Sequence, residues 1–363
     1  MEKVNILIIG AGVIGLAIAE KLSKTSEDVV VVEKEKSFGR HTSSRNSEVI
    51  HSGIYYPPGT LKADLCVRGV ELLYDYLNAH NIRYRKCGKL VVAVNPEEEV
   101  ELLHLQNMGR KNGVKGLTLL DSSQCAELEP QIKAFKALSV PSTGIIDTHG
   151  FMESLVHQVE KNDGFIVYDM EVTALKKIGN KYRIGFSNGE IFEADLVINS
   201  AGLFADKIAE MVGIDTEKHD LKLHWCKGEY FKSSKVKNIN KLIYPIPDKI
   251  SLGIHLSINL AGNCRFGPNA YYVDELDYSI NEAHKKDFLN SINKYLDLEE
   301  KYLEMDDCGI RPKLQKPNEN FRDFYIKEES DKGYHNFINL IGIESPGFTA
   351  SLAIAEYVSK IIN

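Results

Sequence analysis

The chain opens with two apolar runs separated by a glycine-rich turn and a helical pattern. Residues 4–9 are almost wholly apolar, as expected of a strand that is buried on both faces of a parallel sheet. Apolar side chains recur at helical spacing over residues 16–23, and a second apolar run at residues 29–32 ends at Glu33. The pattern therefore predicts a complete βαβ unit at the start of the chain.

The turn after the first strand fits the dinucleotide-binding pattern G-x-G-x-x-G with Gly10, Gly12 and Gly15. Gly10 permits a tight turn, Gly12 lets a pyrophosphate approach the backbone, and Gly15 lets the helix pack closely on the strand. The helix N-terminus offers unpaired amides to the phosphates, and Glu33 can accept hydrogen bonds from ribose hydroxyls. An acidic residue at that position disfavours a 2′-phosphate, so the unit predicts FAD or NAD rather than NADP.

Later apolar runs indicate that the chain returns to this sheet. Residues 194–198 form one run, which leads to Ala201 and Gly202, and residues 337–341 form another, which leads to a turn and a final helix. Residues 39–56, by contrast, are too polar for a core element and are typical of a ligand-lining loop that leads into a short strand. Two late returns favour FAD over NAD, because NAD dehydrogenases seldom need them.

Short motifs across essentially the whole chain carry a family resemblance. They are 49–62 (VIHSGIYYPPGTLK), 87–92 (CGKLVV), 143–147 (TGIID), 242–247 (LIYPIP), 253–255 (GIH), 267–270 (GPNA) and 309–312 (GIRP). In this order they resemble the D-amino-acid-oxidase superfamily of FAD-dependent oxidoreductases and, within it, the L-2-hydroxyglutarate dehydrogenase/oxidase group. Members of that group often read His-Asn-Ser-Gly where this chain has Arg45-Asn46-Ser47-Glu48.

The resemblance implies an α/β fold, α+β overall, in which a Rossmann-like FAD-binding domain is interleaved with a substrate domain on an antiparallel sheet. The FAD-binding domain is expected from residues 1–85, 143–212 and 335–363, and the substrate domain from residues 86–142 and 213–334. In the substrate domain the pattern predicts strands at 89–94, 222–231, 251–259 and 263–268, and helices at 97–112 and 280–296. An Asn-Gly pair predicts a hairpin turn within residues 184–191.

The glycine pattern and the resemblance together predict the residues that contact FAD. They are Gly10, Gly12, Val13, Ile14, Gly15, Glu33, Lys34, Thr42, Ser43, Ser44, Arg45, Asn46, Ser47, His51, Val172, Ala201, Gly202, Gly342, Ser345, Pro346, Gly347, Phe348 and Thr349. The last three open the final helix, whose N-terminal amides can stabilise negative charge on a reduced flavin. Some members of the superfamily attach FAD covalently through a histidine or cysteine. For His41 a polar contact is preferred over such an attachment.

Oxidation of an alcohol by a flavin requires a base for the hydroxyl proton while a hydride leaves carbon for flavin N5. A histidine that is neutral near pH 7 suits this role. His51 and His255 are the candidates, and a hydrogen-bonded structural histidine is the alternative for each. The other histidines in helical patterns, His80, His104, His157 and His284, are expected to be exposed.

A 2-hydroxy acid also needs its carboxylate held, which a guanidinium does bidentately. Arg311, in the GIRP motif, matches the superfamily position for this role; the alternative is a loop-stabilising pair with Asp306 or Asp307. A dicarboxylate needs a second cation, and the candidates are Lys227, Arg45 and Lys62. The tyrosines that could add hydroxyl donors, or serve only in packing, are Tyr55, Tyr56 and Tyr244.

The sequence thus predicts an FAD-dependent oxidoreductase that oxidises L-2-hydroxyglutarate, or a close 2-hydroxy acid, to the 2-keto acid. An amine or D-amino-acid oxidase and a glycerol-3-phosphate dehydrogenase of the same superfamily are the nearest alternatives. A flavoprotein that only relays electrons is a third. Oxygen, a quinone and an electron-transfer flavoprotein are all open as electron acceptors.

Composition narrows the partners further. The chain has 363 residues, of which 43% are hydrophobic, enough for a large core and more than one domain. Its net charge of −7 leaves no general basic field for nucleic acid. The six scattered cysteines form no metal-binding pattern, which predicts reduced thiols, no metal and a cytoplasmic protein. The apolar segment 4–19 is too short to span a membrane, although a peripheral contact at the inner membrane face stays open, because family members feed electrons to membrane quinones.

Overall fold

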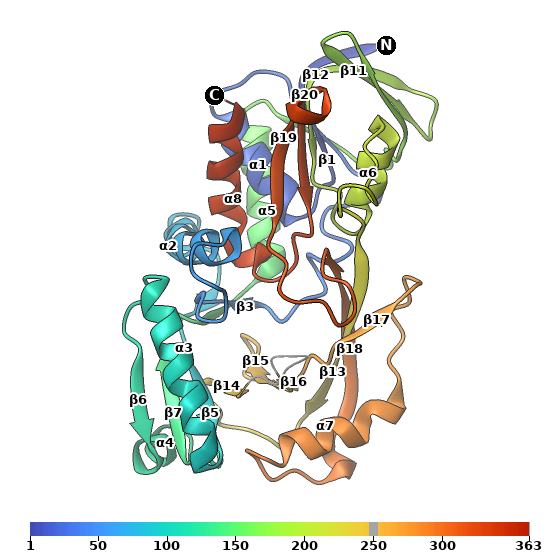
Figure 1. Cartoon of the computed structure of the whole chain (residues 1–363). Coiled ribbons are helices and arrows are strands. Elements are labelled where there is room, and N and C mark those ends of the chain that lie inside the picture. The colour runs from blue at the N-terminus through green and yellow to red at the C-terminus, as the bar shows by residue number, and fades with distance from the viewer. Residues whose placement is uncertain (247–252, 363) are drawn as a thin grey trace. The chain divides into compact units, whose positions relative to one another are not determined.

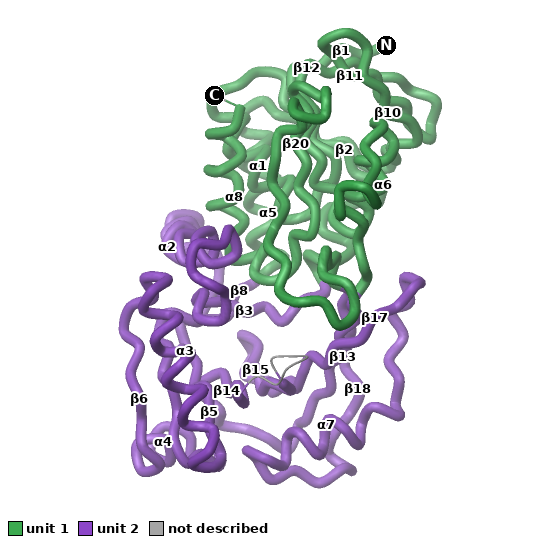
Figure 2. Tube along the Cα trace, viewed as in Figure 1, with its two compact units in different colours: residues 1–44, 148–225, 311–363 green, residues 45–147, 226–310 purple. Residues whose placement is uncertain are grey.

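The computed structural model describes residues 1–246 and 253–362 (Figure 1). Contacts divide the chain into two compact units, each assembled from separate stretches of sequence (Figure 2). Unit 1 contains Met1–Ser44, Thr148–Trp225 and Arg311–Asn363, and unit 2 contains Arg45–Asp147 and Cys226–Ile310. Each unit is therefore discontinuous in sequence.

Unit 1 is built on a mainly parallel sheet. Its strands follow the order β10-β11-β12-β1-β2-β9, with β20 beside β12 and β19 beside β20. The parallel strands are β1 (Glu2–Ile9), β2 (Val29–Val32), β9 (Phe165–Val167), β12 (Ile191–Asn199) and β20 (Tyr334–Ile341). The strands that pair in antiparallel fashion are β10 (Val172–Ile178), β11 (Lys181–Phe186) and β19 (Tyr325–Glu329).

Helices pack on this sheet in two layers. On one face, α1 (Val13–Ser23) packs against α5 (Thr148–Lys161) and α8 (Gly347–Ile362), and the three stand side by side (Figure 1). α6 (Ala205–Val212) packs on β10 and β20, and its apolar side joins a core with Leu7 and Val30 of the central strands. All four valines of β2 are buried, as expected of a parallel strand covered on both faces.

Unit 2 is built on a second sheet with the order β17-β13-β16-β15-β14-β5-β7-β6 and β18 beside β13. The strands are β5 (Lys89–Ala93), β6 (Thr118–Asp121), β7 (Lys136–Val140), β13 (His224–Ser233), β14 (Leu242–Pro245), β15 (Leu256–Ile258), β16 (Cys264–Phe266), β17 (Tyr271–Val273) and β18 (Glu304–Lys313). The pairs β5–β7, β6–β7, β13–β16, β14–β15 and β15–β16 are antiparallel, whereas β14 and β5 are parallel.

The rest of unit 2 consists of helices and a small sheet. The helices are α2 (Leu61–Ala79), α3 (Glu99–Lys111), α4 (Ser122–Leu128) and α7 (Lys285–Ile292). The small sheet joins β3 (Val49–Ile50), β8 (Gly144–Ile146) and β4 (Tyr84–Arg85). One apolar core includes Val91, Phe231 and Ile243 from three strands of the large sheet and Phe288 from α7.

These sheets confirm the predicted fold class, a parallel Rossmann-like sheet together with an antiparallel one. The strands predicted at 89–94, 222–231 and 263–268 are β5, β13 and β16, and the helix predicted at 97–112 is α3. The strand predicted at 251–259 is β15, and residues 251–252 lie outside the described residues. The helix predicted at 280–296 is wrong in length: a 3₁₀ turn capped by Asn281 precedes α7, and α7 ends before Asn293.

The compact units and the predicted functional domains divide the chain at different places. Residues 45–85 lie in unit 2, whereas the FAD-binding domain was expected to extend to residue 85. This stretch holds β3 and β4, and both strands pair with β8, which also belongs to unit 2. A functional domain is defined by what it binds, so its predicted ranges stay a prediction.

Candidate active site

The glycine turn brings β1 and α1 together more closely than side chains would permit. Gly10 has φ +103°, and its N–H donates to the carbonyl oxygen of Val32 at 2.8 Å. A Cβ on Gly15 would lie 2.0 Å from the carbonyl oxygen of Gly10, and a Cβ on Gly10 would lie 2.8 Å from that of Ser200. The tight turn and close helix packing expected of Gly10 and Gly15 are therefore present.

The N-terminus of α1 presents backbone donors. Gly12 precedes the helix in an extended conformation and offers no capping side chain. The Val13 N–H donates to Ser43 Oγ at 3.0 Å, and the same oxygen lies 3.1 Å from where a Cβ on Gly12 would stand. A helix end without a side-chain cap of its own, next to bare glycine backbone, fits the pyrophosphate of a dinucleotide.

Glu33 is buried, and its carboxylate organises the glycine turn. Oε2 accepts a hydrogen bond from the Ala11 N–H at 2.8 Å, and Oε1 accepts one from the Glu35 N–H at 3.0 Å. A carboxylate has roughly four lone-pair sites, so Glu33 keeps acceptor capacity for ribose hydroxyls. The structure therefore adds a role in fixing the turn to the role predicted from the sequence.

The carboxyl ends of the central strands place the other cofactor segments along one edge of the sheet. Ile9 pairs with Asn199, and Asn199 pairs with Asn339, so the loops after β1, β12 and β20 share that edge. A Cβ on Gly347, the first residue of α8, would lie 3.9 Å from Ile14 Cδ1. The structure thus gathers Gly10, Gly12, Val13, Ile14, Gly15, Ala201, Gly202, Gly342, Ser345, Pro346, Gly347, Phe348 and Thr349.

Unit 1 also contains Lys34, a predicted FAD contact, and His41. Lys34 Nζ lies 3.9 Å from the centroid of the Phe204 ring. His41 Nε2 lies 3.0 Å from Glu35 Oε1, and this hydrogen bond is the main reason that the pKa of Glu35 is lowered. His41 thus makes a polar contact of the kind preferred for it. The remaining predicted contacts in this unit are Thr42 and Ser44, on either side of Ser43, and Val172 at the start of β10.

Arg45, Asn46 and Ser47 belong to unit 2. Arg45 bonds to a residue of β18, and Asn46 bonds to a residue of β16. Arg45 Nη1 pairs with Asp307 Oδ1 at 2.8 Å, and the Asn46 carbonyl accepts a hydrogen bond from Arg265 at 3.2 Å. Arg45 already has a carboxylate partner, which counts against it as the second cation for a substrate. The same holds for Lys227, whose buried ammonium lies 3.1 Å from Asp277 Oδ2.

Both candidate bases lie in one aromatic cluster of unit 2, which consists of His51, Tyr55, Lys89, Tyr244 and His255 and is called the Lys89 cluster. The Tyr244 and His255 rings stack with centroids 3.5 Å apart and 11° between their planes. Tyr55 and Tyr244 face one another with centroids 6.5 Å apart. Lys89 Nζ lies 4.4 Å from the Tyr55 centroid and 4.6 Å from the Tyr244 centroid.

The surroundings of His51 in the Lys89 cluster keep its imidazole neutral. Burial, and then the positive charge of Lys89, lower the pKa of His51 to about 3, so its imidazole is neutral at physiological pH. A neutral imidazole is the form that can accept a proton. Burial also lowers the pKa of Lys89 to about 7. His255 is 5% exposed and has one ring face covered by Tyr244, an environment that suits packing.

Arg311 lies on β18, half-buried between the buried residues Ile310 and Pro312. The backbone beside it is tightly packed: a Cβ on Gly309 would lie 2.2 Å from the carbonyl oxygen of Arg45. Asp306 and Asp307, which were considered as structural partners for Arg311, pair in unit 2 with Arg265 and Arg45. Of the other predicted substrate residues, Lys62 is buried in the first turn of α2, and the Tyr56 carbonyl accepts a hydrogen bond from Asn112.

Sequence reasoning missed Lys89 and misplaced His284. Lys89 begins an apolar run that is typical of a core strand, and its side chain is 1% exposed. The lysine inside the CGKLVV motif is the sequence feature that could have identified it. His284 is half-buried and not exposed as expected, and its Nδ1 lies 2.5 Å from Oε2 of the fully buried Glu229. His104 and His157 are exposed as predicted, and His80 is half-buried against Tyr76.

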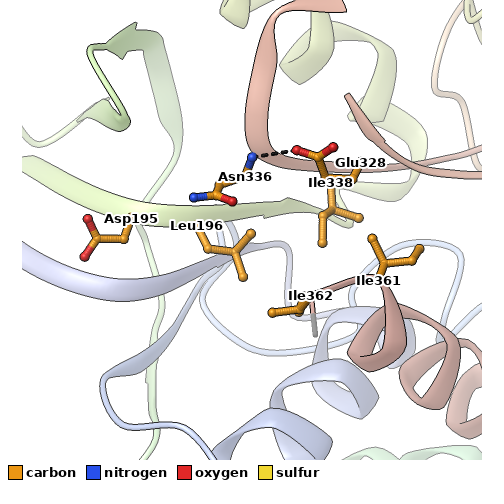
Figure 3. A pocket seen from close by; sticks show the side chains of 7 residues that line it. All are labelled: Asp195, Leu196, Glu328, Asn336, Ile338, Ile361 and Ile362. Atoms are coloured by element: carbon orange, nitrogen blue, oxygen red, sulfur yellow. Dashed lines mark hydrogen bonds between the residues drawn. The ribbon is translucent and has the colours of Figure 1, made fainter. Parts of the chain in front are cut away.

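A further pocket lies in unit 1, with a volume of about 290 Å³ (Figure 3). It is lined by Asp195, Leu196, Glu328, Asn336, Ile338, Ile361 and Ile362. Ile361 and Ile362 are the last residues of α8, whereas Gly347 is its first residue. This pocket is therefore separate from the glycine turn. Within the described ranges, no helix is long and apolar enough to cross a membrane, and no group of three side chains is arranged to hold a metal.

The chain belongs to the family described as FAD dependent oxidoreductase (DAO), which it matches over residues 5–361. It is related, within this class, to the L-2-hydroxyglutarate dehydrogenases. The mitochondrial enzyme of that name from Arabidopsis thaliana is 39% identical over 99% of this chain and 83% of its own length. The one from Bos taurus is 31% identical over 98% of this chain and 88% of its own length.

A solved structure supports the same assignment. FAD-bound L-alpha-glycerophosphate oxidase from Mycoplasma pneumoniae superposes with a TM-score of 0.88 at 26% identity, over 100% of this chain and 95% of that one. The family resemblance, the choice of FAD over NAD and the assignment as an oxidoreductase are therefore confirmed. The cofactor is FAD, and the glycine turn, the N-terminus of α1 and Glu33 fit it.

Proposed function

We propose that this chain oxidises L-2-hydroxyglutarate, or a closely similar 2-hydroxy acid, to the 2-keto acid. The observation that carries the proposal is the Lys89 cluster, which offers a neutral base beside a buried cation. The relatives that align with nearly the whole chain are named L-2-hydroxyglutarate dehydrogenases. A second candidate is oxidation of L-alpha-glycerophosphate, because the solved oxidase of that name has the same fold over the whole chain.

Each side chain has a defined role in the proposed reaction. Arg311 binds the carboxylate next to the alcohol carbon and so fixes which hydrogen is presented for removal. His51 accepts the hydroxyl proton on its imidazole, which its lowered pKa keeps neutral at physiological pH. Bound FAD supplies the acceptor for the hydride that leaves the alcohol carbon. The alcohol thus loses one proton, which His51 holds, and one hydride, and it becomes the 2-keto acid.

The partners follow from the same proposal. The substrate is a small 2-hydroxy acid, and the candidate electron acceptors are oxygen, a quinone and an electron-transfer flavoprotein. Turnover measured with each of the three identifies the acceptor. The two named relatives are mitochondrial, so the cytoplasmic location and the peripheral contact at the inner membrane face stay predictions for this chain.

A substrate panel with two arginine variants tests the proposal. The holoenzyme is assayed with L-2-hydroxyglutarate, L-alpha-glycerophosphate and an amino acid. Arg311→Met should lower kcat/KM for the preferred acid by about a hundredfold, since one charge-assisted bidentate contact is lost, while the protein keeps its flavin. Arg183→Met, an exposed position on β11, is the matched control. Unchanged kinetics for Arg311→Met, or turnover of the phosphate ester alone, contradicts the proposal.

A further inference from the structure

Three lysines are buried among the described residues, and they differ in what neutralises them. They are Lys62, Lys89 and Lys227. Lys227 has Asp277 at 3.1 Å. Lys89 is 1% exposed, and none of the ion pairs formed within residues 1–246 and 253–362 includes it. A buried ammonium without a counter-ion is costly, so it needs a physical explanation.

Among residues 1–246 and 253–362, the groups that face Lys89 do not supply a negative charge. They come from the loop after β3, from α2 and from β14: His51 and Tyr55, Cys66, and Tyr244, with His255 stacked behind it. Burial raises the pKa of Cys66 to about 12 and raises the pKa values of Tyr55 and Tyr244 above their ordinary value, so these groups are neutral at physiological pH. The two ring faces attract the ammonium, but this attraction replaces only part of its lost hydration.

A second polar group in the cluster also lacks a partner. The Tyr55 hydroxyl is buried, and it forms no hydrogen bond with any described residue. Such groups are rare in native proteins and call for an explanation such as a ligand. Among the described residues, the cluster therefore holds a lysine without a carboxylate partner, on β5, and a hydroxyl without a hydrogen-bond partner, on the loop that also holds His51.

We propose that Lys89, assisted by the Tyr55 hydroxyl, binds the distal carboxylate of a dicarboxylate substrate. This inference rests on the proposed function and names the residue that sets its chain-length and charge specificity. A carboxylate accepts hydrogen bonds from the ammonium and the hydroxyl at once, and it supplies the missing negative charge. Among the earlier candidates for a second cation, Arg45 and Lys227 already pair with Asp307 and Asp277.

The same contact would act on the base. The positive charge of Lys89 is one of the two causes that lower the pKa of His51. A bound carboxylate offsets that charge, so the pKa of His51 rises toward its ordinary value and the imidazole becomes a stronger base. A substrate without the distal carboxylate should therefore lose kcat as well as affinity. A lysine that only supports the fold would not produce this effect.

The test compares two substrates of equal chain length on the holoenzyme. L-2-hydroxyglutarate carries the distal carboxylate, and L-2-hydroxypentanoate has a methyl group in its place. Lys89→Met should reduce the ratio of their kcat/KM values by about a hundredfold, mostly by slowing the dicarboxylate. Lys86→Met is the matched control, because Lys86 is an exposed lysine 5.0 Å from the Tyr74 ring centroid in the same unit.

A binding measurement separates this inference from the proposed reaction. Glutarate and pentanoate lack the hydroxyl group, and their affinities are read from the shift in flavin absorbance. Loss of glutarate affinity in Lys89→Met with pentanoate affinity unchanged supports the inference, even if wild-type protein fails to oxidise L-2-hydroxyglutarate and the proposed function falls. An unchanged substrate ratio together with unchanged glutarate affinity in Lys89→Met overturns the inference and leaves the proposed function standing.

Folding of the variant is checked independently. Lys89→Met removes a buried charge and should raise Tm. Tyr55→Phe keeps the packing and removes only the hydroxyl, so it should weaken glutarate binding by about threefold to tenfold. If Lys89→Met does not fold, Tyr55→Phe decides the question: unchanged glutarate affinity overturns the inference.

Discussion

Each unit of the molecule buries a charged side chain, and the two are stabilised in opposite ways. In unit 1 the Glu33 carboxylate accepts backbone N–H groups at 2.8 and 3.0 Å, so both of its oxygens are hydrogen-bonded before any ligand binds. In unit 2 Lys89 lies between two tyrosine faces, without a carboxylate partner among the described residues. The difference indicates a preformed turn in unit 1 and a site that awaits an anion in unit 2.

The largest expected effect comes from a substitution in the preformed glycine turn of unit 1. Gly15→Val places a side chain where a Cβ would be 2.0 Å from the Gly10 carbonyl oxygen, so α1 must move away from the turn. We expect a loss of at least about 3 kcal/mol in stability and a colourless protein after gel filtration. Gly189→Asn, at a hairpin turn with φ +85° and open space, is the control. A yellow Gly15→Val protein of normal Tm would contradict the role given to this turn.

The next effect concerns the base beside Lys89. His51→Gln keeps a polar side chain of similar size and removes the proton acceptor. We expect kcat to fall by about 10²- to 10⁴-fold with the flavin content unchanged. His104→Gln, on the exposed side of α3, should have no effect on kcat. A fall of less than about tenfold in His51→Gln would transfer the role of base to another group, with His255→Gln as the next variant to measure.

The pH dependence sharpens the comparison further. His51 must be neutral, which holds above its pKa of about 3, whereas Lys89 must be charged, which holds below its pKa of about 7. Therefore kcat/KM for L-2-hydroxyglutarate should show no rise between about pH 5 and 7 and should fall by about tenfold per pH unit well above pH 7. The alkaline fall should disappear in Lys89→Met. A rising limb near the ordinary histidine pKa would contradict the electrostatic coupling of the two groups.

The smallest effect concerns the backbone at Glu48, which has φ +57°, a region that costs an ordinary residue about 1–2 kcal/mol. Glu48→Gly removes this conformational cost. The greater conformational freedom of glycine in the unfolded chain lowers the resulting gain in stability by roughly 0.5–1 kcal/mol. We expect stability to rise by less than about 1 kcal/mol, with kcat/KM unchanged within about twofold. Chemical denaturation measures the change, and a clear loss of stability would show that the Glu48 side chain makes a contact that outweighs the strain.

The sequence was most informative where function depends on local backbone. Gly10, Gly12, Gly15 and Glu33 are close in sequence, so their spacing predicted the strand, the turn and the helix of unit 1. The Lys89 cluster is different, because its members come from segments separated by as many as 204 positions, from His51 to His255. Lys89 itself reads as a polar residue at the edge of an apolar strand, and only the stacked rings around it show that its charge is enclosed.

His284 illustrates the same limit. A polar residue in a helical pattern is usually exposed, but here the fully buried Glu229 lies on β13 and turns toward the 3₁₀ turn that carries His284. Pairings between distant elements of this kind depend on the sheet order, which hydrophobic periodicity does not encode. The fold class and the cofactor could therefore be predicted from motifs, whereas the residues that recognise the substrate required the assembled unit.

Anaerobic addition of L-2-hydroxyglutarate to the purified yellow protein is the most direct test of the central claim. The absorbance of the oxidised flavin is followed while the keto acid is quantified. The proposed function predicts rapid bleaching with one equivalent of 2-oxoglutarate formed per flavin. Unchanged absorbance with L-2-hydroxyglutarate, alongside bleaching by L-alpha-glycerophosphate or an amino acid, would contradict it.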